Sequence, residues 1–535
     1  MSGSGRTIGT FAARLVSVLA LACGLSGPAG AADEPRKGGT LVFAVIGDPP
    51  TIDCHAASSF ATMHYVSPHY SLLVKLDPVD TTRVVGDLAQ SWTESANKLT
   101  YTFKLKPGVK FHDGTPLTSA DVKASWDRIR QPPQGVISVR SSVYSRIEAI
   151  DTPDPMTVIF RLKTASPAFL GIMGSPFNCI YSAARLAQDP NFPANEIVGT
   201  GPFVFVERVR GAHWVGRRFD DYFDKPRPYL DGYRAVNTSA ASVVTAQQSG
   251  QVMAQFRTLA PSQVDQLKAA LGDRIQFHST AYSFMVLVAF NTRKAPYDDA
   301  RVRRALSLAI DRWGGAQNLS KVSSLAFVGA TQRPGSPWAA TDEELAICPG
   351  FSKDISASRE EAKKLLREAG QENLSLRLVN RNITDPYTSA GVYLVDQWRQ
   401  IGVKAEHVQL DVGQLMTSMR SGTFDVIIDF VGGEAMDDPS IELGRFVSAD
   451  VSSYNPSGFI DRTVDQLYAK VDSSFDVAER KKLLRELEGR LLTEAYQVPF
   501  MWLNRTVGLD SKVRGFVISP SHFVNQDLAT IWLAQ

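Results

Sequence analysis

Cysteine and long apolar runs are scarce in this sequence, and each scarcity excludes a class of protein. The chain has 535 residues but only four cysteines, at positions 23, 54, 179 and 348, too few for a fold that depends on a disulfide framework. The core must therefore come from buried apolar side chains, which a chain of this length can supply. Beyond residue 31, no apolar stretch is long enough for a membrane-spanning helix.

The sequence also lacks an excess of charge of either sign. It has 57 Lys and Arg against 55 Asp and Glu, and residues 1–31 carry two of the basic residues and none of the acidic ones. No basic stripe is visible along the chain, so we expect no nucleic-acid partner.

The first 31 residues have the pattern of a secretory signal peptide. Arg6 and Arg14 precede a short apolar run at 15–23, and Ala29-Gly30-Ala31 fits a small-residue cleavage site. We expect a mature chain that starts near Ala32 and lies in the periplasm. Lipidation at Cys23 remains an alternative, although the residues before it form a poor lipobox. In an exported chain, one pair among the remaining cysteines (54, 179 and 348) could oxidise; the spacing does not decide which pair.

Strand and helix patterns alternate along the rest of the chain. The sequence predicts strands over 38–45, 98–106, 156–163 and 403–411, and helices over 300–313, 358–370, 389–402 and 478–495, with Ser358 as a helix cap. Because the two patterns are intermixed throughout, the prediction is an α/β fold.

The stretch FHDGTPLTSADV (111–122) raises the question of catalysis, because it places His112 beside Asp113. Asp-Gly-Thr-Pro is turn chemistry, and Thr118 with Asp121 predicts a capped helix behind the turn. Adjacent side chains diverge, which is poor geometry for a catalytic triad. Since G-x-S-x-G and H-E-x-x-H are also absent, we predict that the protein is not an enzyme; an exported hydrolase remains the alternative.

The block LAQSWTESANKLTYTFKLKPGVKFHDGTPLTSADVKASWDRI (88–129) resembles the signature region of family-five extracytoplasmic solute-binding proteins, the peptide-, oligopeptide- and nickel-binding subunits of ABC importers. Further blocks resemble the family in the same order, at 197–205, 287–312, 333–338, 366–370, 397–406, 496–502 and 513–516. The resemblance implies a two-lobed periplasmic binding protein fold with an additional inserted subdomain. Lobe I would span 32–286, with the insertion at about 70–198, and would take back residues 502–535; lobe II would span 287–501.

The resemblance also implies a function without covalent chemistry. The protein would capture a peptide or other small solute in the periplasm, close over it by hinge motion near 287–291 and 502–505, and deliver it to the ABC permease subunits in the inner membrane. We expect a monomer with no cofactor. The family's nickel members raise a nickel- or haem-type chelate binder as an alternative. However, the group Cys54-His55, His64 and His69 matches no tight metal-ligand spacing, so no metal ligands are predicted.

The resemblance also implies where the ligand site lies. Dipeptide-binding members hold the ligand's amine on an Asp in a loop before an Asp-Pro, and they hold its carboxylate on an Arg in the helix before the Ile-Gly-Val-Lys strand (401–404 here). Here the amine position falls on Ala435, and the basic positions fall on about Thr388 and Ser389. Because a buried carboxylate without a cation is costly, a dipeptide is not favoured. The candidate ligand-binding residues, carried over by position, are Ser58, Ser59, Phe60, Met63, Trp338, Tyr387, Phe430, Glu434, Asp437 and Trp502.

Overall fold

A computed structural model describes residues 34–432, 435–452 and 455–535. The predicted signal peptide and Glu434 lie outside the described residues. Residues Pro35–Gln535 form one compact unit by themselves. Within the described ranges, none of the helices combines the length and the apolarity needed to cross a bilayer.

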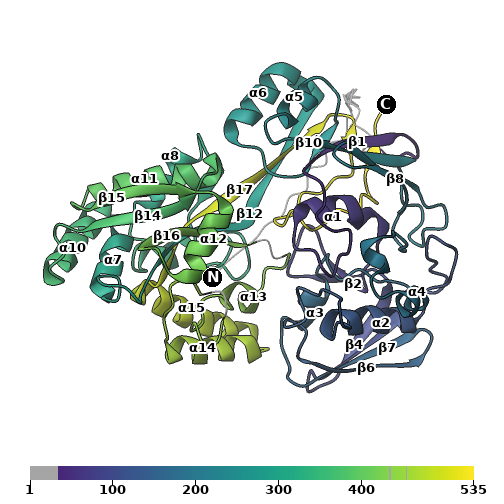
Figure 1. Cartoon of the computed structure of the whole chain (residues 1–535), viewed down its shortest axis with the longest axis horizontal. Helices are drawn as coiled ribbons and strands as arrows, with labels where there is room; N and C mark the ends of the chain where they lie inside the picture. Colours follow the sequence, from purple (N-terminus) through teal and green to yellow (C-terminus); the bar gives the residue numbers. More distant parts are fainter. Residues whose placement is uncertain (1–33, 433–434, 453–454) are drawn as a thin grey trace, which may run out of the picture. The chain divides into compact units, whose positions relative to one another are not determined.

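A large mixed sheet runs through this unit, and two long strands connect its two sides. β12 (Ile275–Phe290) and β17 (Gln497–Asp510) pair antiparallel from one end to the other, Ile275 opposite Asp510 and Ala289 opposite Gln497 (Figure 1). The strand order is β15-β14-β16-β12-β17-β11-β1-β10-β9-β8. The remaining bounds are β11 (Ala254–Gln255), β1 (Thr40–Ile46), β10 (Gly232–Thr238), β9 (His213–Arg218), β8 (Phe203–Val209), β16 (Val426–Gly432), β14 (Ser375–Arg381), β15 (Lys404–Leu410) and β13 (Leu325–Phe327), which pairs with β17.

On the β1 side, aromatic residues dominate the core. β1 pairs parallel with β10 and β11, and α1 (Phe60–Val66) packs against them. The side chains of Tyr65, Trp214 and Tyr233 are almost fully buried there. A disulfide joins Cys54, in the loop after β1, to Cys179, which settles the cysteine pairing that the spacing left open and leaves Cys348 as a thiol.

A separate four-stranded sheet carries its own core. Its order is β4 (Ala89–Glu94), β5 (Thr100–Leu105), β7 (Thr157–Leu162) and β6 (Ile147–Asp154). Apolar side chains of this sheet pack with α2 (Ser119–Arg130) and α3 (Phe169–Met173). Residues 89–175 are called the four-stranded unit below. The strands predicted at 98–106 and 156–163 are confirmed as β5 and β7.

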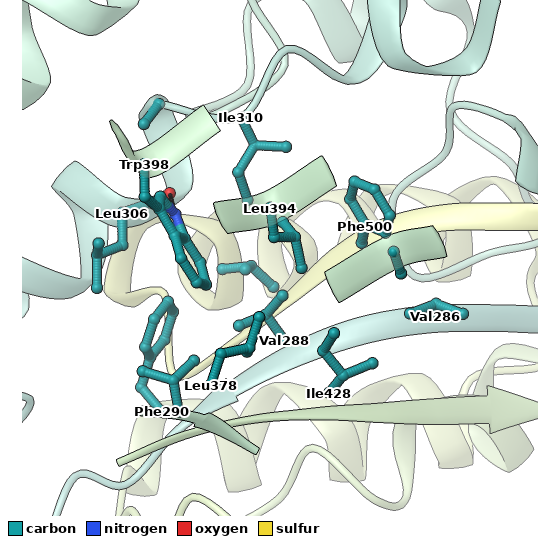
Figure 2. Packing of buried hydrophobic residues seen from close by; sticks show 14 of the residues in the cluster. Val286, Val288, Phe290, Leu306, Ile310, Leu378, Leu394, Trp398, Ile428 and Phe500 are labelled. Atoms are coloured by element: carbon teal, nitrogen blue, oxygen red, sulfur yellow. Dashed lines mark hydrogen bonds between the residues drawn. The ribbon is translucent and has the colours of Figure 1, made fainter. Parts of the chain in front are cut away.

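Side chains of α7, α10 and α11 pack with one set of residues from β14 and β16, and side chains of α12, α14 and α15 pack with another. Residues 300–494 are called the helical unit below. One core beneath it gathers Val288, Phe290, Leu306, Leu378 and Trp398, and Figure 2 shows these side chains converging. The helices are α7 (Ala300–Leu308), α8 (Arg312–Leu319), α9 (Asp342–Ala346), α10 (Ile355–Glu368), α11 (Ser389–Arg399), α12 (Val412–Ser421), α13 (Pro439–Leu443), α14 (Arg462–Ser473) and α15 (Val477–Glu494). The predictions at 389–402, 403–411 and 478–495 are confirmed as α11, β15 and α15.

Two helix predictions are wrong in detail. The helix predicted over 300–313 is two helices, because the Asp311 carboxylate accepts the Gly314 N–H at 2.8 Å and starts α8 afresh. α10 begins one turn earlier than predicted, with Asp354 rather than Ser358 as its cap. The Ser358 hydroxyl instead donates back to the Asp354 carbonyl at 3.0 Å.

Candidate functional site

His112 has a structural role in the fold. Its Nε2 bonds the Gly201 carbonyl at 3.0 Å, and its Nδ1 accepts the Gly199 N–H at 3.4 Å. Burial lowers the pKa of His112 to about 4, so the ring is neutral near pH 7. The predicted cap is confirmed, since the Thr118 N–H donates to the Asp121 carboxylate at 2.7 Å. Because both ring nitrogens bond backbone groups, His112 links its own turn to the segment that contains Gly199 and Gly201.

His55 and His69 also use their ring nitrogens within the fold. His55 bonds the Cys179 carbonyl at 3.0 Å through Nε2, and its Nδ1 lies 2.9 Å from a guanidinium nitrogen of Arg128. His69 bonds the Phe203 carbonyl at 2.7 Å and accepts the Trp214 indole N–H at 2.9 Å. In the described ranges, no three His, Cys, Asp or Glu residues are grouped so that they could hold a metal ion.

Three of the predicted ligand-binding residues belong to one row of aromatic side chains. From Phe60 the row passes to His522 at 4.1 Å between ring centroids, and from there to Tyr282 at 5.5 Å. On β12, Tyr282 neighbours Phe284 at 5.7 Å, and Phe284 stacks on Phe430 at 4.7 Å. Tyr387 completes the row, because the Arg381 guanidinium lies over both the Tyr387 ring at 4.2 Å and the Phe430 ring at 5.1 Å. This aromatic row joins the β1 side of the sheet to the helical unit.

A buried charge cluster stands at the helical end of the aromatic row. The side chain of Asp429, in β16, is fully buried and accepts from Arg381 at 3.2 Å and from Arg445 at 2.7 Å. Nη1 of Arg381 is buried and has no hydrogen-bond partner. At the other end, Arg257 lies 5.8 Å above the Phe60 ring. The row therefore runs between positively charged groups.

A cavity of about 590 Å³ lies between the four-stranded unit and the helical unit. This volume falls in the range typical of small-molecule sites. Its wall on the four-stranded side includes Arg140, Tyr144, Arg146, Lys163, Gly171 and Ile172, and its wall on the helical side includes Ala435, Met436, Ser440, Ile441, Tyr468 and Asp472. The lining thus mixes apolar, hydroxyl and charged groups.

The one acidic side chain among the described lining residues is already paired. Asp472 accepts from the Arg146 guanidinium at 3.3 Å and from the Ser166 hydroxyl at 3.4 Å. Burial raises the pKa of Tyr468 to about 12, and its neutral hydroxyl donates to the Ser440 carbonyl at 2.9 Å. Ala435, the position to which the resemblance assigns an amine anchor, presents only a methyl group.

None of the nine candidate ligand-binding residues that the structure describes is among the residues lining this cavity. The Asp437 carboxylate is occupied by the Arg333 guanidinium and the Thr81 hydroxyl. Trp338 is half-buried, with the Arg480 guanidinium 4.9 Å above its ring. Two further residues are core: Met63 is fully buried, and so is Trp502, whose indole N–H donates to the Ala330 carbonyl.

Ser58 and Ser59 lie in the loop that leads into α1. Ser58 is exposed, and the Ser59 hydroxyl accepts the Thr62 N–H at 3.2 Å as the cap of that helix. Sequence reasoning missed Arg381, Asp429 and Arg445, although a signal existed: Asp429 interrupts the apolar run VIIDFV of β16. An acid inside a buried strand requires a cation nearby.

Comparisons with known proteins agree on one family. The family model for bacterial extracellular solute-binding proteins, family 5, matches residues 83–453. The glutathione-binding protein GsiB of Escherichia coli O1:K1 is 27% identical over 499 residues, covering 90% of this chain and 92% of the relative. Heme-binding protein A of Haemophilus influenzae is 26% identical over 471 residues, covering 82% of this chain and 83% of the relative.

Solved structures show the same fold. The periplasmic binding protein AgaA of A. tumefaciens R10, in complex with agropinic acid, matches with a TM-score of 0.74 and 25% identity, covering 93% of this chain and 99% of that one. DppA of Helicobacter pylori, in complex with the peptide STSA, matches with a TM-score of 0.77 and 23% identity, covering 94% and 99%. The predicted α/β fold of the two-lobed periplasmic binding protein class is therefore confirmed.

Proposed function

Because the chain belongs to family 5 of the bacterial extracellular solute-binding proteins, whose role is to bind a solute, we propose that it captures a small organic solute in the periplasm and passes it to the permease of an ABC importer. The predicted signal peptide at residues 1–31 would direct its export. Binding and release need no bond to break, so hydrolysis is no part of the proposal.

The cavity of about 590 Å³ carries this proposal. Its walls come from two units with separate cores, so it is complete only while those units are in contact. A solute that touches both walls stabilises the closed arrangement by its differential affinity for it, which is how binding would drive closure. The mixed lining suits a solute with both apolar and hydrogen-bonding parts.

The proposed hinge lies on β12 and β17, between lobe I (residues 32–286 and 502–535) and lobe II (287–501). The pairing of the two strands shifts register between Ala281 and Met285 and again between Val286 and Leu287, opposite residues 499–504. Register breaks of this kind bend and twist a strand pair locally. They support bending at the place where the two strands pass from one lobe to the other.

For the solute class, we propose a peptide longer than a dipeptide or a non-peptide organic acid. The relatives point to a range of solutes, since their names and complexes include glutathione, heme, agropinic acid and a tetrapeptide. Ala435 offers no carboxylate for a dipeptide amine, and Asp472 and Asp437 are each engaged by an arginine. These features argue against a free amine as the main anchor.

The proposal can be tested on protein purified from the periplasm without denaturation. Native mass spectrometry should detect a co-purified solute that remains through dialysis, and X-ray scattering should show a larger radius of gyration once that solute is removed. A thermal-shift panel of glutathione, trialanine, tetraalanine and agropinic acid covers the proposed classes. An unchanged scattering curve together with no retained solute and no thermal shift would contradict the function. Turnover of ester or peptide reporters would favour the hydrolase alternative.

A further inference from the structure

Met436 of the helical unit occupies the space where Gly171 of the four-stranded unit has no side chain. A Cβ atom built on Gly171 would lie 1.7 Å from Sδ of Met436 and 2.2 Å from its Cε. No real pair of atoms approaches so closely without a bond. Because both residues line the cavity, this contact is also part of the cavity wall.

Apolar neighbours surround Met436 in that position. Its side chain packs against the apolar group of Leu76, Ala435 and Val524, two of which come from outside the helical unit. The next residue, Asp437, accepts two hydrogen bonds from Arg333 within the helical unit and one from Thr81, which lies outside both named units. The apolar side chain of Met436 and the carboxylate of Asp437, which are adjacent in sequence, therefore stabilise the same edge of the cavity.

We propose that Met436 and Gly171 form a specificity-determining contact, which closes the solute cavity and limits the size of the solute at that end. The inference rests on the proposed function and goes beyond it by naming the residues that set solute size. Only a residue without a side chain lets the thioether reach the α3 backbone, and only a long, unbranched side chain fills the gap. A smaller residue at 436 would extend the cavity towards α3.

The two residues can be tested separately. Gly171→Ala adds one methyl group in a helix, where alanine is the more favourable residue, so a loss of binding would not come from a weaker helix. Gly489→Ala is the matched control, because Gly489 lies in α15 and a Cβ there meets nothing within 4 Å. Met436→Ala removes the thioether side chain and leaves the backbone of both units unchanged.

A cross-link tests the contact without any solute. In a Cys348→Ser background, the double variant Gly171→Cys/Met436→Cys should form a second disulfide in the periplasm, detected as a mass loss of two hydrogens and a mobility change on reduction. Each single variant, with one new thiol, is the control. Absence of the cross-link in the double variant would overturn the contact.

Affinity then tests the role in selection, using the probes glutathione, trialanine, tetraalanine and pentaalanine in a titration calorimeter. We expect Gly171→Ala to weaken the best-bound probe at least tenfold while the melting temperature of the solute-free protein stays level or rises, as in Gly489→Ala. We expect Met436→Ala to shift the preference to a longer probe by tenfold or more. Equal affinities in wild type, Gly171→Ala and Met436→Ala would overturn the inference. Failure of every probe to bind the wild type would instead count against the proposed function, and the cross-link would still decide the contact.

Discussion

The Arg333 guanidinium donates two hydrogen bonds to the Asp437 carboxylate, from Nε to Oδ1 at 2.9 Å and from Nη2 to Oδ2 at 2.6 Å. The Thr81 hydroxyl donates a third, to Oδ2 at 2.6 Å. Such forked, charge-assisted pairs are stronger and more directional than single hydrogen bonds. Asp437 thus belongs to the structure that holds the cavity edge, and its oxygens are already used.

Substitutions at these residues should separate stability from binding. Asp437→Asn leaves the largely buried Arg333 without its counter-charge, so we expect the free energy of unfolding to fall by about 3 kcal/mol. Thr81→Val removes only the bond from outside the helical unit, so stability should change little while affinity for a bound solute falls several-fold. Urea unfolding and titration calorimetry measure the two effects. If Thr81→Val binds as the wild type does, the bond does not contribute to closure.

The Cys54–Cys179 disulfide should make a large contribution to stability. It closes a loop of 125 residues, and such bonds typically contribute about 2–5 kcal/mol, chiefly by restricting the unfolded chain. Reduction, or Cys54→Ser with Cys179→Ser, should lower the urea midpoint accordingly. Cys348→Ser is the control and should leave the midpoint unchanged, because Cys348 forms no disulfide. Equal midpoints for oxidised and reduced protein would contradict the pairing.

Where local patterns predicted a strand or a helix, the structure mostly has one there, because alternation and helical periodicity report burial directly. β5, β7, α11 and α15 follow from their apolar spacing alone. The prediction failed where one side chain could override periodicity. The apolar stripe continues through Ile310, but the Asp311 carboxylate offers a better-satisfied start for a new helix.

The candidate site was less predictable, because its contacts join residues far apart in sequence. Asp437 is 104 positions from Arg333 and 356 from Thr81, so its pairing leaves no local trace. Phe60, Tyr387 and Phe430 belong to one aromatic row, and Met63 and Trp502 are fully buried; the role of all five in binding stays a prediction. The sequence pattern around an aromatic residue or a methionine is the same whether its side chain faces a cavity or the core.

Buried neutral histidines should make the protein less stable in acid. Burial is the main cause that lowers the pKa of His55 to about 4 and of His69 to about 3. In the unfolded chain their pKa is about 6.5, so between about pH 6.5 and 4 the unfolded state binds more protons. Their contribution is full above about pH 6.5 and is lost as the pH falls towards 4, by up to about 1.4 kcal/mol per pH unit for each ring.

Urea unfolding at intervals between pH 7.5 and 4 would measure this slope. His55→Gln keeps a donor for the Cys179 carbonyl but cannot titrate, so it should flatten the slope by roughly one histidine's share. His213, at the start of β9, is partly buried and pairs with Glu207, and it provides the matched control His213→Gln. A slope that His55→Gln and His213→Gln reduce equally would show that burial of His55 is not the cause.

Asp429 should be the most sensitive single position of the buried charge cluster at the helical end of the aromatic row. Its side chain is 0% exposed and balances Arg381, which is 3% exposed, and Arg445, which is 10% exposed. Asp429→Asn removes the buried carboxylate that accepts from Arg381 and Arg445, and breaking a buried pair in this way typically costs about 3–5 kcal/mol.

A second substitution identifies the cause of that loss. In the Asp429→Asn background, Arg381→Met removes the buried cation that has lost the Asp429 carboxylate and should restore part of the stability, although the same change in the wild type is destabilising. Asp151→Asn, which breaks an ion pair with Arg161 at side chains about half exposed, should cost less than about 1 kcal/mol. If Asp429→Asn costs no more than Asp151→Asn, water must reach the cluster, and the row would then be open to solvent at its helical end.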